Sequence, residues 1–302
     1  MKALLLAAGL GTRLRPLTLM KPKSLVPVLN RPVIARNIDY LRNYDIEEII
    51  VNAHYHSRQI LDYLGKGDFP GVSIEVRVET EILGTGGGIK NCSDFWDDSP
   101  FIVMNSDILT DIDLKKVLEY HNASQCVATL VLHDYEPFNQ IRIDDESQIV
   151  DISQGKKPGR LAFTGIHILE PGTLSYIPES GYSSIIDCYK RMIRSHTAIN
   201  AYLSKGHYWH DIGSPDRYMK ANREMLKLHE MVSEIGRDSI IAPSAEFIDW
   251  AIVGEKAHVE DGVEIERSIL WDHVKVRENV RIIDSIVTSY RDVEKDLIRE
   301  IY

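Results

Sequence analysis

The sequence predicts an α/β protein with a mostly parallel sheet flanked by helices, followed by a short C-terminal left-handed parallel β-helix. Over the first two thirds, apolar strand-like runs alternate with helical patterns, which is typical of a parallel sheet covered by helices. The first apolar run, Ala3–Ala8, leads directly into a glycine loop, where ligands bind in such sheets. From about residue 237 the apolar residues instead fall on a six-residue grid, which indicates a β-helix.

The strands and helices follow from local patterns. Apolar runs of strand length predict strands at Lys2–Ala8, Glu48–Ala53, Ser73–Val78, Phe101–Asn105, Cys126–His133, Ile141–Ile143, Ile149–Ile152, Ala162–Leu169 and Ala198–Leu203. Apolar residues at helical spacing predict a helix after Pro32, one opened by Asp113, one over about Ser183–Arg194, and one starting at Ser214-Pro215. Ser214 is a good N-cap, and a proline suits the first helical position. This last helix, Pro215–Met231, is expected to join the two domains.

The predicted domains are a catalytic domain, 1–235, and a β-helix with its tail, 236–302. One register of the grid holds Val253, Val259, Ile265 and Trp271, and another holds Ala251, Ala257, Val263 and Ile269. An irregular β-meander is the alternative, because the grid slips after Trp271. About two or three turns fit between Ser239 and Thr288.

Composition and charge exclude several classes of protein. The 302-residue chain has a formal net charge of −10, which argues against a nucleic-acid partner. No apolar run approaches the roughly 18 residues of a membrane span, and Met1-Lys2 leads straight into a core strand, so we expect neither a membrane partner nor a signal peptide. The three cysteines, Cys92, Cys126 and Cys188, are scattered, which favours reduced thiols in a cytoplasmic protein.

The loop after the first strand combines glycines with cations. Gly9 and Gly11 allow close approach of backbone N–H groups to an anion, and the cations that follow can neutralise it: Arg13, Arg15, Lys21 and Lys23. No P-loop string follows the strand, and Leu14 occupies the third glycine position of the dinucleotide fingerprint. Gly-x-Gly alone would indicate only a turn, but the cations make the loop a predicted polyphosphate site.

The string L-A-A-G-x-G-T-R-L-R-P-L-T-x-x-x-P-K resembles the signature of the nucleoside-diphosphate-sugar pyrophosphorylases, or sugar-1-phosphate nucleotidyltransferases. The resemblance implies a Rossmann-like mixed sheet, the nucleotide-diphospho-sugar transferase fold. It implies that the nucleotide is bound by Leu6, Ala8, Gly9, Gly11, Thr12 and Arg13. It also makes Arg13 and Lys23 catalytic residues that stabilise charge on the reacting phosphates.

A second glycine-rich string, Leu83–Ile89, follows a strand and is expected to open a helix. It resembles the family's loop that holds the base and ribose. By this resemblance Gly84, Thr85 and Gly86 bind the nucleotide, and Glu81 faces the base as in guanylyl-transferring relatives. A flexible turn is the alternative for a glycine cluster alone. On the sugar side, the resemblance implies contacts from Asn105, Asp107, Lys156 and Gly165. The family's E-K-P element is imperfect here, because Gln154–Pro158 lacks the glutamate.

Two aspartates are implied as magnesium ligands. Asp107 ends the run Phe101–Asp107 and matches the family's first metal ligand, and carboxylate oxygens suit Mg²⁺. Asp113, a competitor nearby, is explained as a helix N-cap. Asp211 lies in a string that resembles the family's W-x-D-x-G-[ST]-P motif and matches the second ligand. A zinc site built on His207, His210 and Asp211 is less favoured, because no second histidine cluster accompanies them.

The implied activity is Mg²⁺-dependent transfer of a nucleotide from a nucleoside triphosphate to a sugar 1-phosphate, with release of pyrophosphate. The Glu-x-Leu-Gly-Thr-Gly string favours GTP and mannose 1-phosphate. The alternatives are uridylyl or thymidylyl transfer to another sugar or amino-sugar 1-phosphate, and a non-catalytic regulatory subunit on the same fold. A short β-helix leaves open strand edges, so we expect a homo-oligomer formed through the C-terminal domain.

Overall fold

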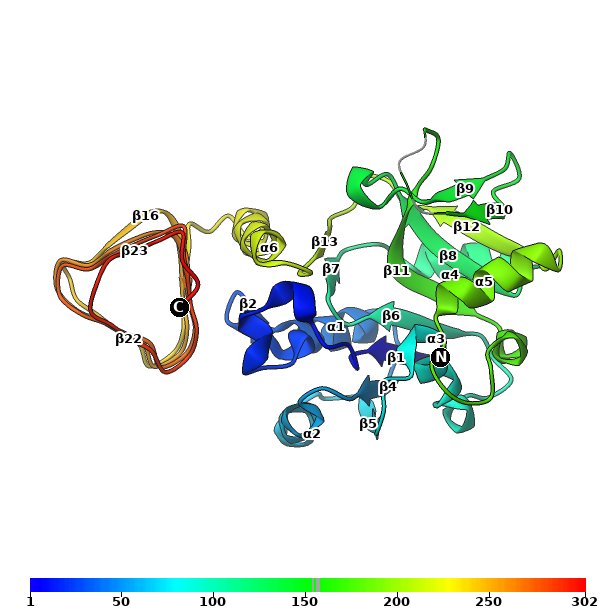
Figure 1. The fold of residues 1–302 in the computed structure, drawn as a ribbon, viewed down its shortest axis with the longest axis horizontal. Coiled ribbons are helices and arrows are strands. Elements are labelled where there is room, and N and C mark those ends of the chain that lie inside the picture. Colours follow the sequence, from blue (N-terminus) through cyan, green and yellow to red (C-terminus); the bar gives the residue numbers. More distant parts are fainter. Residues whose placement is uncertain (154, 156–157) are drawn as a thin grey trace. The chain divides into compact units, whose positions relative to one another are not determined.

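The computed structural model describes residues 1–153, 155 and 158–302, and these pack as two compact units. The first unit contains Met1–Leu10 and Ile34–Trp209, and the second contains Gly11–Val33 and His210–Tyr302. One boundary between the two units therefore falls within the predicted phosphate-binding loop, between Leu10 and Gly11. Figure 1 shows the course of the chain, coloured from blue to red.

A seven-stranded sheet forms the centre of the first unit, in the order β12-β8-β11-β6-β1-β4-β5. Its strands are β1 (Lys2–Leu6), β4 (Glu48–Ala53), β5 (Ser73–Val78), β6 (Phe101–Asn105), β8 (Ala128–His133), β11 (Ala162–Leu169) and β12 (Ile199–Leu203). The pairs β6-β1, β1-β4, β4-β5 and β12-β8 are parallel, and β11 alone runs antiparallel to its neighbours β6 and β8. The prediction of a mostly parallel, mixed sheet is confirmed.

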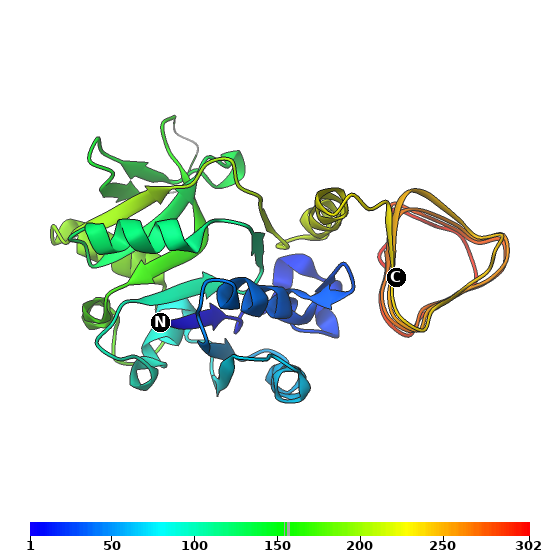
Figure 2. The same ribbon diagram turned by 180° about the vertical axis from the view of Figure 1, so that it is seen from behind.

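Helices cover both faces of this sheet: α5 lies in front of it in Figure 1 and α4 lies in front of it in the reverse view of Figure 2. The helices are α1 (Val33–Arg42), α2 (Ser57–Lys66), α3 (Gly84–Lys90), α4 (Leu114–Ala123) and α5 (Ile185–Arg194). As predicted, Asp113 caps α4, because its side chain accepts hydrogen bonds from Lys115 N and Lys116 N. The sequence patterns did not predict α2, which buries only Ile60 and Leu64.

Shorter elements complete this part of the chain. The short strands are β2 (Pro27–Val28), β3 (Arg31–Pro32), β7 (Ile108–Thr110), β9 (Ile141–Ile143), β10 (Ile149–Ile152) and β13 (Trp209–Asp211). The 3₁₀ turns are η1 (Thr12–Leu14), η2 (Leu17–Leu19), η3 (Lys23–Leu25), η4 (Ser93–Phe95), η5 (Glu136–Phe138) and η6 (Pro171–Tyr176). The core of the first unit joins strands such as β1 and β6 to α5, through Leu4, Val103 and the fully buried Tyr189.

In the second unit, α6 (Pro215–Leu228) precedes a stacked parallel structure that we call the coil, residues 233–302. Its strands are β14 (Ser233–Ile235), β15 (Ile240–Ile241), β16 (Glu246–Val253), β17 (His258–Val259), β18 (Glu264–Leu270), β19 (Lys275–Val276), β20 (Arg281–Ile283), β21 (Ile286–Val287), β22 (Asp292–Val293) and β23 (Leu297–Ile298). All pairings between them are parallel, and the coil has a triangular outline in Figure 1. One face stacks four strands, β15-β17-β19-β22; three of them, β15, β17 and β19, lie between Ser239 and Thr288, where two or three turns were expected, and β22 lies beyond that range.

The predicted six-residue grid matches the buried positions of the coil until the strand register shifts by one residue. Ala251, Val253, Val259 and Ile265 are buried in its core, as expected. Glu246 pairs with Glu264, eighteen residues on, but Ala251 pairs with Ser268, seventeen residues on, so one residue is lost between these pairs. Leu270 then enters the core in place of Trp271. The inward position predicted for Trp271 is therefore wrong, and its indole N–H bonds to Tyr218 on α6 instead.

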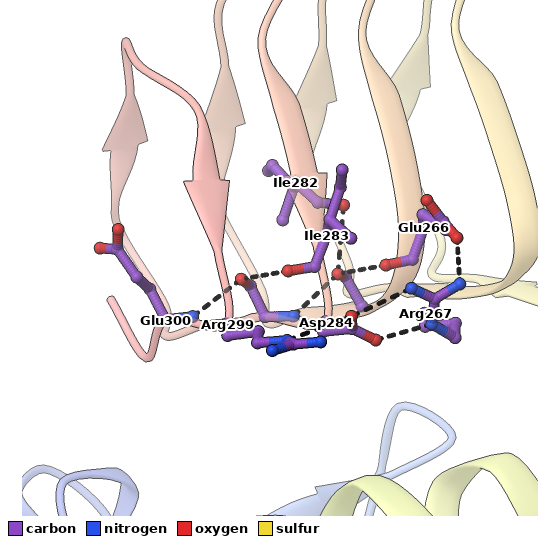
Figure 3. Close-up of polar contacts among 9 residues, drawn as sticks. Glu266, Arg267, Ile282, Ile283, Asp284, Arg299 and Glu300 are labelled. Atoms are coloured by element: carbon purple, nitrogen blue, oxygen red, sulfur yellow. Dashed lines mark hydrogen bonds and ion pairs between the residues drawn. The ribbon is translucent and has the colours of Figure 1, made fainter.

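The corners of the coil contain residues with positive φ angles, a backbone conformation that residues other than glycine rarely adopt. At one corner, positive φ angles recur at stacked positions: Asp249, Arg267, Asp284 and Arg299. Figure 3 shows how the side chains bridge successive turns there: Arg267 bonds Asp284 through two nitrogens, at 2.6 and 3.0 Å, and Glu266 through a third. These groups are partly exposed, so each pair contributes at most about 1 kcal/mol. Their main effect is to fix which turn stacks on which.

None of the helices in the described ranges is long and apolar enough to cross a membrane. All three cysteines are buried free thiols. Burial raises the pKa of the Cys92 thiol to about 12, so this residue stays protonated and unreactive near neutral pH.

We predict opposite effects on stability for two glycine-to-alanine substitutions. A Cβ on Gly254 would lie 2.4 Å from the backbone carbon of Trp271, so Gly254→Ala should destabilise the coil by about 1–3 kcal/mol. A Cβ on Gly65, in α2, would meet no described atom within 4 Å, so Gly65→Ala should stabilise the protein by about 0.5 kcal/mol or more. Thermal unfolding of the two variants measures both effects. A midpoint for Gly254→Ala at or above that of the unchanged protein contradicts the tight stacking.

Candidate active site

In the first unit, the carboxyl ends of β1 and β6 lie side by side. Leu6 pairs with Asn105, and Leu6 O accepts hydrogen bonds from Ser106 N (3.1 Å) and Ser106 Oγ (2.7 Å). Asp107 follows directly, in the turn between β6 and β7. The structure therefore brings three predicted residues, Leu6, Asn105 and Asp107, to one edge of the sheet, where ligands bind in α/β folds.

A buried amide joins this edge to the second glycine string. Asn52, at the end of β4, accepts a hydrogen bond from Ala7 N (2.7 Å) and donates one to Glu79 Oε1 (2.7 Å). Glu79 Oε2 in turn accepts from Leu83 N (3.2 Å), just before α3. Burial raises the pKa of Glu79, although both hydrogen bonds oppose that shift. Asn52 and Glu79 thus fix the geometry of the two predicted nucleotide-binding segments relative to each other.

The sequence analysis missed both Asn52 and Glu79. A local signal existed: each polar residue stands at the carboxyl end of an apolar or alternating strand, β4 or β5. Glu81, the acidic residue singled out instead, is exposed. Its predicted place beside the base stays a prediction.

The glycines of the second string open a helix, as the sequence predicted, because α3 begins at Gly84. A Cβ on Gly88 would stand 2.6 Å from Asn52 Nδ2, and one on Gly84, whose φ is +72°, would stand 2.6 Å from Ser183 O. Gly86 N donates to Ser183 O (2.8 Å), and Thr85 Oγ1 accepts from Ile185 N (3.0 Å). Close packing of α3 on its neighbours therefore requires these glycines, whatever ligand they also contact.

The predicted sugar-side residues Asn105 and Gly165 touch. Gly165 lies at an irregularity in the β11–β8 pairing with a φ of +85°, and a Cβ there would stand 2.6 Å from Asn105 Nδ2. A larger residue at this position would displace the Asn105 side chain. Lys156, the third sugar-side residue, lies outside the described residues.

A cluster of rings that the sequence did not predict adjoins Gly165. Trp209 donates from Nε1 to Thr164 O (2.9 Å), and the rings of His133 and Tyr135 lie 4.7 and 5.2 Å from its ring. His207 Nε2 lies 3.3 Å from His133 Nδ1, and its Nδ1 lies 2.8 Å from Ser204 Oγ. Burial, with the neighbouring His207, lowers the pKa of His133 to about 4, so this imidazole is neutral at pH 7. These histidines form a structural cluster with the aromatic rings.

In the second unit, Arg13 lies on the 3₁₀ turn η1 and Lys23 on η3, while Arg15 directly follows η1 and Lys21 lies between η2 and η3. Gly11 has a φ of +62°, and its missing Cβ would lie 2.8 Å from Thr18 Cγ2 and 3.4 Å from Lys23 Cβ. The turn at Gly11 therefore places Lys23 close to the start of the loop. Thr12 and Arg13 are exposed on η1, and Lys23 is half-buried on η3.

Asp211 is buried and paired with a cation from α6. Arg217 Nη1 lies 2.9 Å from Asp211 Oδ2, and a Cβ on Gly213 would come within 2.6 Å of both partners. Ser214 Oγ caps α6 by accepting from Arg217 N (3.4 Å), as predicted. A carboxylate suits Mg²⁺, and it can bind the ion through one oxygen while its other oxygen stays paired with Arg217. Within the described ranges, no group of three or more His, Cys, Asp and Glu is arranged to hold a metal ion.

Comparison with known proteins gives a family match over most of the chain. The family model described as "Nucleotidyl transferase" matches residues 2–227. A putative mannose-1-phosphate guanyltransferase of Sulfolobus acidocaldarius is 31% identical over 273 residues, which covers 89% of this chain and 75% of that protein. A UTP–glucose-1-phosphate uridylyltransferase of Synechocystis sp. is 26% identical over 347 residues and covers 98% of this chain and 89% of that protein.

Among solved structures, HddC from Yersinia pseudotuberculosis, complexed with GMP-PN, superposes with a TM-score of 0.64 at 26% identity. The match covers 74% of this chain and 99% of that one. The likeness therefore extends over almost the whole of HddC and leaves about a quarter of the present chain outside it.

We predict that the link through Asn52 is required for nucleotide binding. Asn52→Asp keeps an acceptor for Ala7 N but sets a carboxylate against Glu79, and we expect at least about tenfold weaker binding of nucleoside triphosphate. In the double variant, Asn52→Asp with Glu79→Gln, an amide at position 79 can donate to the carboxylate at position 52. The double variant should therefore recover most of the lost nucleotide affinity. Titration calorimetry on the single and double variants measures the coupling. Additive losses in the double variant would show that the two side chains act independently.

Proposed function

The chain belongs to the nucleotidyl transferase family and is a sugar-1-phosphate nucleotidyltransferase, and we propose that GTP and mannose 1-phosphate are its substrates. The single observation that carries the site assignment is the edge at which Leu6 and Asn105 are paired and Ser106 bonds Leu6 O. It sets Asp107 next to the strand that leads into the first glycine loop. The name of the Sulfolobus acidocaldarius relative supports guanine and mannose.

In the proposed reaction, an oxygen of the sugar 1-phosphate attacks the α-phosphorus of the nucleotide in line. The new bond joins that oxygen to the α-phosphorus, the bond from the α-phosphorus to the bridging oxygen breaks, and pyrophosphate leaves with the electron pair. The attacking phosphate is already an anion near pH 7, since its second pKa is about 6, so no general base is required. The protein has to align the reactants and neutralise charge.

We assign the neutralising charge to Arg13 and Lys23 and the metal ligands to Asp107 and Asp211. Arg13 acts on the departing pyrophosphate, and Lys23 holds the phosphates in register. Two carboxylates fit Mg²⁺, which prefers oxygen ligands and fills its remaining positions with water and phosphate. When bound, the ion would neutralise phosphate charge that the two cations leave uncompensated.

The remaining nucleotide contacts stay with the residues named from the sequence: Leu6, Ala8, Gly9, Gly11, Thr12, Glu81, Gly84, Thr85 and Gly86. Gly9 is a distinctive member of this set, since a Cβ there would meet no described atom within 4 Å. Packing within the described chain does not require a glycine at this position. Close approach of the backbone to a ligand phosphate would explain it.

Uridylyl transfer to glucose 1-phosphate or a related sugar is the second candidate. The Synechocystis relative carries that activity in its name and aligns over almost the whole of this chain. A non-catalytic subunit is disfavoured, because Arg13, Lys23, Asp107 and Asp211 are all retained.

A pyrophosphate-release assay with Mg²⁺, over four nucleoside triphosphates and a panel of sugar 1-phosphates, tests the proposal. We expect the highest kcat/KM for GTP with mannose 1-phosphate. A higher value for UTP with glucose 1-phosphate would replace the substrate assignment by the second candidate. No turnover with any pair would contradict the proposed reaction.

Substitution of the charged residues should affect turnover rather than folding. Asp107→Asn and Asp211→Asn should each lower kcat by about 100-fold or more, because each removes a ligand charge for the metal. Arg13→Ala and Lys23→Ala should lower kcat more than they raise KM, because charge develops on the phosphates in the transition state. Asp113→Ala is the control, since that carboxylate caps α4 and should cost only about 1 kcal/mol of stability. Wild-type kcat in both Asp107→Asn and Asp211→Asn would refute the metal assignment.

For the C-terminal part we propose a left-handed parallel β-helix over residues 236–302 that joins copies of this cytoplasmic protein into a homo-oligomer, with 1–235 as the catalytic part. The first turn of the coil supports this, because it exposes Val232, Ile235 and Ile240 along the edge strands β14 and β15. We expect Ile240→Lys to shift the oligomer towards monomer. A strict monomer at micromolar concentration in light scattering would contradict the proposal.

A further inference from the structure

The segment that follows Lys23 in the second unit contains a strained turn. Leu29 and Asn30 have φ angles of +44° and +56°, and they connect the paired strands β2 and β3. Two consecutive positive φ angles define a type I′ turn, in which a leucine is unfavourable, because its Cβ crowds the backbone there. Such a conformation persists only where the surroundings hold it in place.

Two fully buried side chains of α6 hold that turn. Tyr218 OH donates to Pro27 O (2.7 Å), and Asn222 Oδ1 accepts from Leu29 N (3.0 Å). Asn222 Nδ2 also donates to Tyr218 O (2.9 Å), which fixes the orientation of its amide. The strand that enters the strained turn and the first residue of the turn are therefore both bonded to side chains of α6.

The coil supplies the other contacts. Trp271 donates from Nε1 to Tyr218 OH (2.9 Å), and Asn30 Nδ2 donates to Val253 O at the end of β16 (2.8 Å). Lys21 Nζ lies 5.1 Å from the centre of the Trp271 ring, a cation–π distance. Burial lowers the pKa of Lys21, and the nearby Asp272 carboxylate opposes that shift.

Lys23 lies between these two attachment points. Lys21 is held against the Trp271 ring on one side, and Pro27 is bonded to Tyr218 on the other. The intervening residues Ser24–Val26 are buried, so the backbone that carries the Lys23 side chain has little freedom. The indole N–H of Trp271 reaches this segment through one hydroxyl group, that of Tyr218.

We propose that Trp271 and Tyr218 are positioning residues through which the coil holds Lys23 in its catalytic geometry. The inference rests on the proposed role of Lys23 in nucleotidyl transfer. It gives the coil a part in turnover, beyond any part in assembly. It also explains why Trp271 leaves the interior of the coil at the register shift: the indole is needed on the outside, against α6.

The test compares Trp271→Phe and Tyr218→Phe with Trp250→Phe in the full-length protein. Trp250 is the matched control, because it is also a buried coil tryptophan and its Nε1 has no hydrogen-bond partner among the described residues. Two quantities are measured: kcat and KM in pyrophosphate release, and hydrogen–deuterium exchange over residues 11–33. Exchange reports on the loop independently of turnover.

We expect kcat to fall about fivefold in Trp271→Phe and about tenfold or more in Tyr218→Phe, which loses both hydrogen bonds of the hydroxyl. KM for the sugar 1-phosphate should change less than twofold, exchange over 11–33 should accelerate, and Trp250→Phe should match the unchanged protein.

A kcat in Trp271→Phe equal to that in Trp250→Phe overturns the inference, with or without faster exchange. If Tyr218→Phe does not fold, Trp271→Phe decides alone. Absence of turnover in the unchanged protein would contradict the proposed function, whereas unchanged exchange over 11–33 in Trp271→Phe would overturn this inference by itself.

Discussion

The arrangement of the segments at the carboxyl ends of β1, β4 and β5 in the first unit depends on one buried amide, that of Asn52. Asn52 uses its oxygen for Ala7 N and its nitrogen for Glu79, and Glu79 reaches on to Leu83 N. Both side chains are almost fully buried, so loss of either partner would leave an unsatisfied polar group, at a cost of about 1–3 kcal/mol. The close fit of Gly88 over the pair leaves no space for a side chain. The positions of two backbone segments, far apart in the sequence, are thereby set by the hydrogen-bond geometry of one residue.

In the second unit, too, one buried polar group bonds segments that are distant in the sequence, and here it is the hydroxyl group of Tyr218. Tyr218 OH is donor to Pro27 O and acceptor from Trp271, and it is buried without exposure to water. Burial raises the pKa of this phenol far above neutrality, so it remains a donor at every physiological pH. The three short 3₁₀ turns of this segment lead into the β2–β3 hairpin, and side chains of α6 hold that hairpin at Pro27 O and Leu29 N. Cations that act on phosphates need such support, because a misplacement of about 1 Å can cost 100-fold in rate.

Much of this arrangement follows from local sequence signals. Apolar runs located the strands, Ser214 and Asp113 marked helix starts, and the position after β6 identified Asp107. What the sequence did not reveal depends on contacts between distant residues. Asn52 and Glu79 are 27 residues apart, and Trp271 is 53 residues from Tyr218. The sequence predicted that the glycines of α3 open a helix, but it could not show that close contacts with Ser183 and Asn52 require glycine there. The sequence showed the grid slipping after Trp271, but it did not show that the shift comes earlier, between the Ile248–Glu266 and Ala251–Ser268 pairs.

In the proposed reaction the sugar phosphate displaces pyrophosphate from the α-phosphorus in a single in-line step, with the protein supplying alignment and charge and forming no covalent intermediate. The stereochemical course of transfer tests it most directly. With one diastereomer of a nucleoside α-thiotriphosphate as donor, phosphorus NMR of the nucleotide-sugar product reveals the configuration at that phosphorus. The account predicts inversion. Retention would indicate two successive displacements through a nucleotidyl-enzyme intermediate and would contradict it.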